Sequence, residues 1–159
     1  TPSGRGSQNW LDADHPSSLE PWKRPRLTPN PAMAFKDGKL LMPFGTPGGD
    51  TQPQTMLQVF LNIAVFGMNA QEAIEAPRFQ SQNFPNSFWP HAYLAGSLRL
   101  EGRIGSEIGS VLEQRGHAIS WMGTYDAGTG SCCAITVDHD KGTITAGADY
   151  RRESYAIGR

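Results

Sequence analysis

Two short, mostly hydrophobic runs around a turn give way to helical spacing in the first half of the chain. The runs 32–35 and 39–44 flank an Asp-Gly dipeptide, which is typical of the turn of a β-hairpin. After a glycine-rich turn at 45–50, apolar residues recur at helical spacing from 56 to 66 and predict a buried helix that ends at Gly67. The pattern therefore predicts a strand, a glycine turn and a buried helix in direct succession.

Helices and strands alternate in the second half of the chain. The amphipathic pattern of 106–115 predicts a helix that turns Ile108, Val111 and Leu112 toward the core. Residues 78–94 hold five aromatic side chains among Asn, Pro and Gln, and we expect a surface loop with those rings buried. This mixture of elements favours an α+β layered sandwich. The other elements that the pattern predicts are a helix over 70–76, strands over 97–104 and 117–122, and a second hairpin of 131–137 and 143–147.

The N-terminal part of the chain differs from the rest in composition. Residues 1–30 are rich in Pro, Ser, Gly and Asp, so we expect an extended segment that lies against an α+β body of 31–159. No internal repeat or domain boundary is expected. The chain does not begin with Met and lacks a signal-peptide pattern at 1–8, so Thr1 is expected to be a processing product or a sequence boundary.

Composition narrows the classes of partner. The chain has 159 residues with 14 basic and 15 acidic side chains, and beyond 23–26 it has no dense basic run to attract a nucleic acid or an anionic membrane. The longest apolar stretch, 56–68, is shorter than the roughly 20 residues that span a bilayer. We therefore expect a small-molecule or protein partner, no nucleic acid and no membrane insertion.

Cysteine and histidine positions argue against a disulfide or a metal site. Cys132 and Cys133 are neighbours, and a bridge between adjacent cysteines closes a strained ring, so we expect two free thiols packed in a strand. The four histidines are dispersed, without an i, i+4 pair or a CxxC motif beside them. Neither a metal nor a cofactor is expected.

The glycine-rich turn is the sharpest local feature that can carry chemistry. In Gly45-Thr46-Pro47-Gly48-Gly49-Asp50, adjacent glycines allow two consecutive backbone N–H groups to converge, and the following helix N-terminus adds positive potential. Such a turn can hold an oxyanion or a carboxylate. The alternative interpretation is a plain tight turn with Asp50 as the helix N-cap. The turn lacks the fingerprints of nucleotide-binding loops.

Two charged segments offer further candidates. Three prolines stiffen 23–31, so Thr28 can present a hydroxyl and a neighbouring arginine can meet a carboxylate; the alternative is a stiff connector with solvated charges. Asp149 with Arg151 and Arg152 can bind an anion, but we favour a local ion pair that pins the tail. Thr1 is rejected as a self-activated nucleophile because the residues after it do not start a strand.

Several motifs follow one another at compatible spacing along the chain, among them Lys23-Arg24-Pro25, Gly45-Thr46-Pro47-Gly48-Gly49, Glu75-Ala76-Pro77-Arg78-Phe79 and Gly147-Ala148-Asp149-Tyr150-Arg151-Arg152. Together they resemble the C-terminal part of gamma-glutamyltransferase-like proteins over nearly the whole chain. The resemblance implies an N-terminal nucleophile hydrolase, a proenzyme that cuts itself into a large and a small subunit and exposes a Thr that attacks a γ-glutamyl amide. The implied fold is a four-layer αββα sandwich, with residues 1–159 as the C-terminal portion of the catalytic domain.

The resemblance also implies roles for individual residues. Gly48 and Gly49 fall on the family's Pro-Gly-Gly amides, which form the oxyanion hole. Leu27 and Thr28 replace two serines that contact the substrate carboxylate, so only Thr28 retains a hydroxyl. Gln8 falls at or near an acidic residue that grips the substrate α-amino group, and a neutral amide binds an ammonium group less well. Cleavage of glutaryl-type amides, as by cephalosporin acylase-like members, is therefore an alternative to γ-glutamyl specificity.

The resemblance places the nucleophile outside the chain. It implies that the Thr and the first strands of the small subunit precede Thr1, so this chain alone is expected to be inactive and to expose apolar surface. Its expected partners are the large-subunit and upstream small-subunit segments of the same proenzyme. A degenerate, non-catalytic family member is the remaining alternative. Family members are often exported, which implies a periplasmic or secreted location, with the cytoplasm as the alternative.

Overall fold

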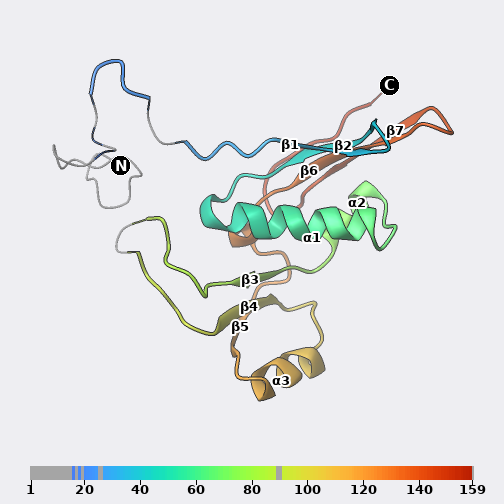
Figure 1. The fold of residues 1–159 in the computed structure, drawn as a ribbon. Coiled ribbons are helices and arrows are strands. Elements are labelled where there is room, and N and C mark those ends of the chain that lie inside the picture. The colour runs from blue at the N-terminus through green and yellow to red at the C-terminus, as the bar shows by residue number, and fades with distance from the viewer. Residues whose placement is uncertain (1–15, 17, 19, 25–26, 89–90, 159) are drawn as a thin grey trace.

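The computed structural model describes residues 16, 18, 20–24, 27–88 and 91–158 and confirms the α+β class (Figure 1). None of the described helices combines the length and the apolar character needed to cross a bilayer. The elements are, in chain order, β1 (Ala32–Lys36), β2 (Lys39–Gly45), the 3-10 turn η1 (Gly49–Thr51), α1 (Gln52–Ala64), α2 (Ala70–Glu75), β3 (Phe79–Ser81), β4 (Ser97–Glu101), α3 (Ser106–Gln114), β5 (Ala118–Met122), the 3-10 turn η2 (Ala127–Thr129), β6 (Cys133–Asp138) and β7 (Thr143–Ala148).

The described strands form two sheets, and α1 contacts both of them. One sheet has four antiparallel strands in the order β1-β2-β6-β7; the other has three in the order β3-β4-β5, with β4 and β5 parallel. Both predicted hairpins are confirmed, since Ala34 pairs with Met42 and Ile135 pairs with Ala146. Gln54 and Gln58 of α1 exchange hydrogen bonds with the backbone of β3. This helix therefore joins the two halves of the fold.

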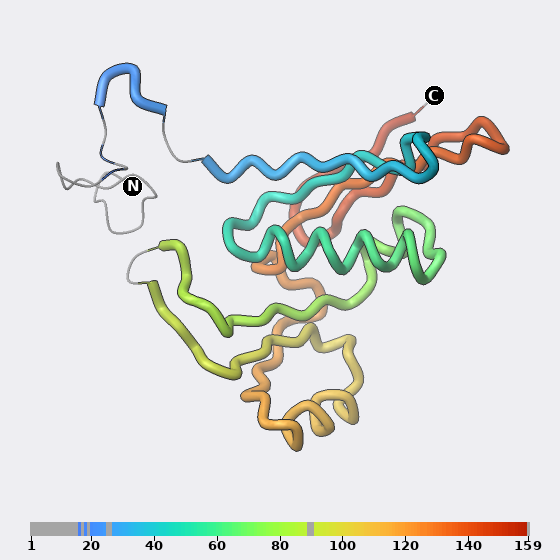
Figure 2. The backbone as a smooth tube through the Cα atoms, in the orientation of Figure 1, coloured from blue at the N-terminus to red at the C-terminus, as the bar shows by residue number. Residues whose placement is uncertain are grey.

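The hydrophobic core lies between the four-stranded sheet and the helices α1 and α2. Val59, Ile74 and Ala134 are buried there, at no more than 1% exposure. Phe44 of β2 stacks on Phe60 of α1, with 6.2 Å between the ring centroids. Figure 2 shows α1 and α2 following one another along the same side of the sheet. The predicted burial is confirmed for Met56 and Val59 of α1 and is wrong for Leu57 and Phe66, which are 57% and 69% exposed.

Local sequence signals define the helix ends. Asn69 and Glu72 form a capping box at the start of α2, and this helix ends before Pro77, which excludes helical backbone at the residue before it. The predicted first helix is α1, but it ends at Ala64 rather than at Gly67, which takes a φ of +70° in the turn that follows. The predicted boundaries thus hold to within a few residues.

The segment 78–94 differs from the predicted loop in two ways. Part of it forms β3, which pairs antiparallel with β4 because an open edge of that strand is available beside it. The prediction that its aromatic rings are buried is wrong for Phe79, Phe84 and Tyr93, which are 45%, 39% and 55% exposed. Phe79 lies on β3, the edge strand of its sheet, and Phe84 and Tyr93 lie in the loop between β3 and β4. The rings therefore stay at the surface of this chain.

Helix α3 packs on the three-stranded sheet without closing over it. Ile108 and Leu112 line an open apolar pocket of about 510 Å³ against Leu98 of β4. The prediction that the apolar face of this helix is buried is wrong for Ile108 and Val111, which are 50% and 46% exposed. One helix over three short strands buries too little surface to enclose that face.

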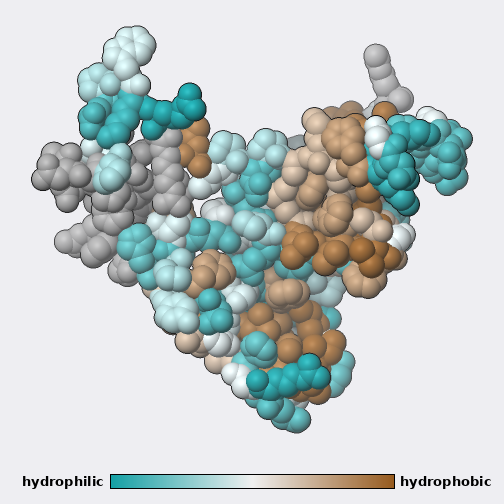
Figure 3. Space-filling model, viewed as in Figure 1, coloured by the Kyte–Doolittle hydropathy of each residue, from teal (hydrophilic) through white to brown (hydrophobic). Residues whose placement is uncertain are grey.

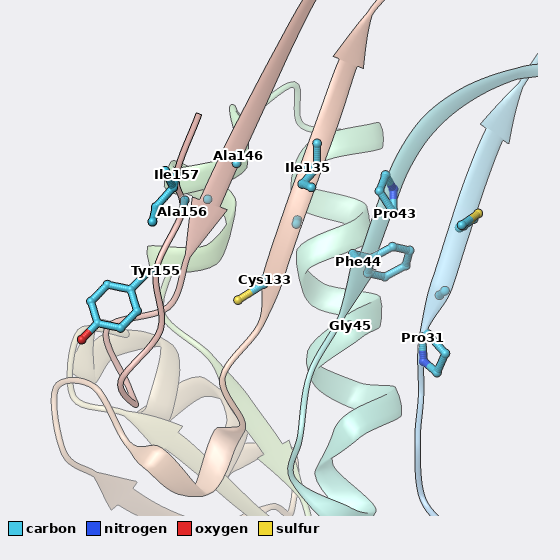
Figure 4. A pocket seen from close by; sticks show the side chains of 14 residues that line it. Pro31, Pro43, Phe44, Gly45, Cys133, Ile135, Ala146, Tyr155, Ala156 and Ile157 are labelled. Atoms are coloured by element: carbon cyan, nitrogen blue, oxygen red, sulfur yellow. The ribbon is translucent and has the colours of Figure 1, made fainter. Parts of the chain in front are cut away.

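The face of the four-stranded sheet opposite the helices carries no helix or sheet among the described residues. Met33, Ile135 and Ile144 are 68%, 41% and 72% exposed. Figure 4 shows an open apolar pocket of about 710 Å³ on this face, with Tyr155 and Ile157 of the C-terminal segment along one side. Figure 3 shows further apolar surface over α1 and around α3. The predicted exposure of apolar surface is confirmed.

Candidate active site

A pocket of about 540 Å³ lies at the start of α1, beside the glycine turn. It brings together Thr28 of the N-terminal segment, Gly49 and Asp50 of the turn, and Phe84 of the loop after β3. Two of the predicted site residues, Thr28 and Gly49, thus line one pocket although they lie on different elements. The Thr28 side chain is exposed and makes no hydrogen bond with another described residue, so its hydroxyl is accessible.

The structure does not bring all predicted substrate-binding residues to this pocket. Leu27 is absent from the lining, and its side chain is 66% exposed. Gln8 lies outside the described residues. The pocket therefore contains one of the three predicted substrate contacts, the Thr28 hydroxyl.

The two glycines of the turn adopt conformations that a side chain would obstruct. Gly48 has a φ of +140°, and a Cβ there would lie 2.6 Å from the Cγ2 atom of Thr51. Gly49 has a φ of +57°, and a Cβ there would lie 3.1 Å from the Phe88 ring. Backbone conformations with positive φ favour glycine. The turn therefore needs glycine at both positions, for conformation and for space.

The backbone N–H groups of Gly48 and Gly49 donate to no acceptor among the described residues. The carbonyl of Gly48 accepts a hydrogen bond from the Thr51 N–H at 3.2 Å, which holds the peptide unit between the two glycines. Because a peptide unit is planar and trans, the Gly49 N–H points away from that bond. The turn leads directly into α1, whose N-terminus adds positive potential. Such free donors can bind a negatively charged oxygen.

Asp50 does not cap the helix, so the alternative interpretation of the turn is wrong on this point. The N-cap of α1 is Thr51, without a side-chain hydrogen bond. The Asp50 carboxylate instead accepts from the Ser87 N–H and from the Ser87 hydroxyl, both at 2.6 Å. Asp50 thus fixes the loop that carries Phe84 and Phe88 against the pocket.

A second turn, formed by residues 126–131, packs directly against the glycine turn. The Ser131 N–H donates to the Thr46 hydroxyl at 2.8 Å, and the Thr55 hydroxyl donates to the Thr129 carbonyl at 2.6 Å. A Cβ at Gly130 would lie 2.5 Å from the Thr46 Oγ1 atom and 2.9 Å from the Pro47 carbonyl oxygen. Sequence reasoning missed this contact. A glycine just before a predicted strand was the one local signal for it.

A buried cluster of four charged side chains holds the second turn from the other side. It consists of Arg78, Glu101, Asp149 and Arg151, each at most 5% exposed. The carboxylate oxygens of Asp149 lie 2.7 Å from Nη2 of Arg78 and 3.1 Å from Nη1 of Arg151. The Oε1 atom of Glu101 lies 2.6 Å from Nε of Arg151. The predicted ion pair at the tail is confirmed in Asp149 and Arg151, whereas the exposed Arg152 donates to the Ala127 carbonyl.

The carboxylates of the cluster are fully engaged. Each of the four oxygens of Glu101 and Asp149 accepts at least two hydrogen bonds or ion-pair contacts. Burial raises the pKa of Glu101, but hydrogen bonds from Arg151 and from two backbone N–H groups outweigh it and hold that pKa below its usual value. Asp149 also accepts from the Cys132 N–H, and Arg78 donates to the Thr129 carbonyl. The cluster therefore fixes both ends of the segment 129–132.

The two cysteines are free, as predicted, but the prediction that both pack in a strand is wrong, because Cys132 precedes β6 and Cys133 is exposed. Cys132 is buried, and burial raises the pKa of its thiol to about 12, whereas Cys133 is exposed on the open face of the sheet. Within the described ranges, no group of three His, Cys, Asp or Glu side chains is arranged to hold a metal ion.

Comparisons with known proteins agree with this fold. The family model for gamma-glutamyltranspeptidase matches residues 1–159. A glutathione hydrolase-like YwrD proenzyme of Bacillus subtilis is 38% identical over 154 residues, which are 97% of this chain and 28% of the relative. An oxamate amidohydrolase proenzyme of Klebsiella pneumoniae is 33% identical over 155 residues, which are 97% of this chain and 28% of the relative.

A solved structure extends the comparison to the acylases. The crystal structure of cephalosporin acylase from Bacillus halodurans superposes with a TM-score of 0.72 at 30% identity, over 91% of this chain and 25% of that one. The chain thus spans about a quarter of the length of these relatives. The predicted kinship with N-terminal nucleophile hydrolases is confirmed. With a match over its full length and relatives above 30% identity, the chain belongs to the gamma-glutamyltranspeptidase family.

Proposed function

We propose that this chain supplies the oxyanion hole and part of the acyl-binding pocket of an N-terminal nucleophile amidohydrolase or transferase. One observation carries the proposal: the free N–H groups of Gly48 and Gly49 lie at the start of α1, beside a pocket that also contains the Thr28 hydroxyl. Residues 1–159 would form the C-terminal portion of the catalytic domain, with 1–30 as an extended segment and 31–159 as the body. The Thr nucleophile is proposed to come from outside this chain, which alone would be inactive.

The reaction follows from that arrangement. The Thr hydroxyl attacks the carbonyl carbon of an amide and loses its proton to a base, while the carbonyl oxygen gains negative charge. The N–H groups of Gly48 and Gly49 donate to this oxygen, and removal of one such donor typically costs about a hundredfold to a thousandfold in kcat. The intermediate then expels the amine, which takes a proton, and leaves an acyl-enzyme. Water or an amine acceptor releases the acyl group.

The proposed substrates are γ-glutamyl amides, with glutaryl-type amides as the alternative. Thr28 would contact the acyl group through its hydroxyl, beside Leu27, which has no polar group to offer. Gln8, if it meets the substrate α-amino group, would bind it without charge assistance. The names of the relatives support cleavage of amides with different acyl groups, since they include glutathione hydrolases, an oxamate amidohydrolase and acylases. A degenerate, non-catalytic member is the other alternative.

The proposed partners are the remaining segments of the same proenzyme. The glutathione hydrolase-like and oxamate amidohydrolase relatives are proenzymes, and this chain covers 28% of the length of each. The uncovered face of the four-stranded sheet, with Met33, Ile135 and Ile144 exposed, is apolar enough to need a covering layer. The second sheet of an αββα sandwich would provide it. A periplasmic or secreted location is proposed from the family, with the cytoplasm as the alternative.

The test uses the complete proenzyme that contains this chain. Its products are mapped by intact mass, and hydrolysis of a γ-glutamyl anilide and a glutaryl anilide is measured. We expect a subunit that begins with Thr upstream of Thr1, and turnover of at least one anilide. Thr28→Val should raise KM for the preferred anilide about tenfold, Thr28→Ser should leave it nearly unchanged, and Thr143→Val on the exposed β7 strand should have no effect. Absence of both a Thr-initiated subunit and any turnover would favour the non-catalytic alternative.

A further inference from the structure

The peptide unit between Pro47 and Gly48 presents the first donor of the proposed oxyanion hole. Its N–H belongs to Gly48 and donates to no described acceptor, and its carbonyl belongs to Pro47. The unit is planar and trans, so the direction of the carbonyl sets the direction of the N–H on the opposite side. Whatever holds the Pro47 carbonyl therefore aims the Gly48 donor.

The Thr46 hydroxyl holds that carbonyl. Its Oγ1 atom donates to the Pro47 carbonyl oxygen at 2.8 Å and accepts from the Ser131 N–H at 2.8 Å. The hydroxyl has one proton, so the bond from Ser131 leaves that proton free for the Pro47 carbonyl. Thr46 is 7% exposed, so water does not readily replace either partner. The pair of bonds connects the glycine turn to the second turn, 126–131, through one side-chain atom.

We infer that the Thr46 hydroxyl is a positioning group for the oxyanion hole, which fixes the Pro47–Gly48 peptide plane so that the Gly48 N–H points at the reacting oxygen. This inference rests on the proposed function. Thr46 does not touch the substrate in it; it acts through the peptide unit that follows. The carbonyl of the next peptide unit, Gly48 to Gly49, is held by the Thr51 N–H instead. The two donors are therefore aimed by two independent bonds.

Gly130 shows that the fit between the two turns is tight. A Cβ at this position would approach the Thr46 Oγ1 atom to 2.5 Å and the Pro47 carbonyl oxygen to 2.9 Å, the two atoms that form the positioning bond. The second turn thus comes as close to this bond as a residue without a side chain permits. Its own place is fixed by the buried contacts of Arg78 and Thr55 with the Thr129 carbonyl. The peptide plane is therefore held against a rigid support.

The test compares three variants of the complete, processed enzyme with its preferred anilide. Thr46→Val keeps the shape of the side chain and removes the hydroxyl, Thr46→Ser keeps the hydroxyl, and Ser97→Ala removes a part-buried hydroxyl that donates to Gln82 beside the three-stranded sheet, away from both turns. We expect Thr46→Val to lower kcat at least about tenfold with KM within about twofold of the wild type, because the misplaced donor matters most in the transition state. Thr46→Ser should restore kcat to within about threefold. Ser97→Ala should leave kcat unchanged, although it also removes a hydrogen bond.

The outcomes separate this inference from the proposed function. Wild-type enzyme that cleaves neither anilide would refute the proposed function, and the inference would fall with it. Active wild type together with a Thr46→Val variant of unchanged kcat would overturn the inference alone. Equal losses of kcat in Thr46→Val and Ser97→Ala would also overturn it, because the effect would then follow from a general loss of stability. Failure of Thr46→Val to fold would shift the decision to Thr46→Ser and Thr46→Ala, which must then differ in kcat at equal KM.

Discussion

The glycine turn and the buried charge cluster both contact the segment 126–132. They differ in whether their polar groups have hydrogen-bond partners. In the cluster, the oxygens of Glu101 and Asp149 each accept at least two contacts. In the turn, the N–H groups of Gly48 and Gly49 have no described acceptor. Engaged buried charges hold a structure in place, whereas free donors beside a pocket are available to a ligand. The cluster is therefore suited to support the turn, and the turn is suited to bind a ligand.

Removal of one charge from the cluster should have the largest effect on stability. Glu101→Gln keeps the volume of the side chain but leaves Arg151 buried beside a neutral partner. We expect the complete protein to lose about 3–5 kcal/mol of unfolding free energy, the usual cost of breaking a buried ion pair. Denaturant unfolding measures this loss. Asp138→Asn, which breaks the exposed pair with Lys141, is the control and should change nothing measurable. Equal losses of unfolding free energy in both variants would contradict the supporting role of the cluster.

A side chain at Gly130 should affect both regions at once. Gly130→Ala introduces a Cβ at a φ of +88°, in contact with Thr46 and Pro47. We expect a loss of about 1–3 kcal/mol of stability and at least about a tenfold loss in kcat, because the glycine turn must shift. Gly142→Ala is the matched control, since its φ is +64° and no atom lies within 4 Å of the added Cβ. That variant should lose about 1 kcal/mol and retain full kcat. Retained kcat in Gly130→Ala would show that the turns are not coupled.

Lowering the pH should destabilise the cluster by protonating the Glu101 carboxylate. Its folded-state pKa lies below the usual value of 4.5, so its ionised form contributes stability that is complete above 4.5 and is lost as the pH falls through the folded-state pKa. We expect Tm to fall as the pH is lowered from about 6 to about 3, and to fall less in Glu101→Gln, which has no proton to take up there. Thermal unfolding across this range measures both slopes. Parallel slopes would mean that Glu101 does not contribute.

The smallest expected effect concerns the loop beside the pocket. Ser87→Ala removes the hydroxyl bond to Asp50 and leaves the backbone bond in place. We expect a loss of about 1 kcal/mol in stability, as for one partly buried hydrogen bond, and a rise of a few-fold in KM with kcat unchanged. Steady-state kinetics of the complete enzyme checks the second part. A change in kcat instead of KM would assign the loop to the oxyanion hole rather than to the pocket wall.

Much of the fold could be predicted from the sequence because its signals are local. An Asp-Gly turn and a run of apolar residues at helical spacing each act within a few positions, and β1, β2 and α1 follow them. Strand β3 could not be predicted, since its three residues form a strand only by pairing with β4. The half-exposed face of α3 could not be predicted either, because spacing shows which side chains share a face but not whether anything covers it.

The candidate site divides in the same way. Gly48 and Gly49 were recognisable because adjacent glycines before a helix are a local signature of converging N–H groups. The support behind them was not, because Thr46 meets Ser131 across 85 positions and Arg151 meets Glu101 across 50. The alternative in which Asp50 caps the helix fails for the same reason, since its partner Ser87 lies 37 positions away. Local patterns thus located the donors, and only the folded chain shows what holds them.

The central claim is that Gly48 and Gly49 bind the oxygen of the reacting carbonyl. The most direct measurement is a crystal structure of the complete enzyme trapped as its acyl-enzyme with a slow amide or ester substrate. The account predicts the carbonyl oxygen within about 2.7–3.1 Å of both the Gly48 and the Gly49 nitrogen atoms, with the acyl chain in the pocket beside Thr28. A carbonyl oxygen bound by other groups, more than about 4 Å from both nitrogens, would contradict it.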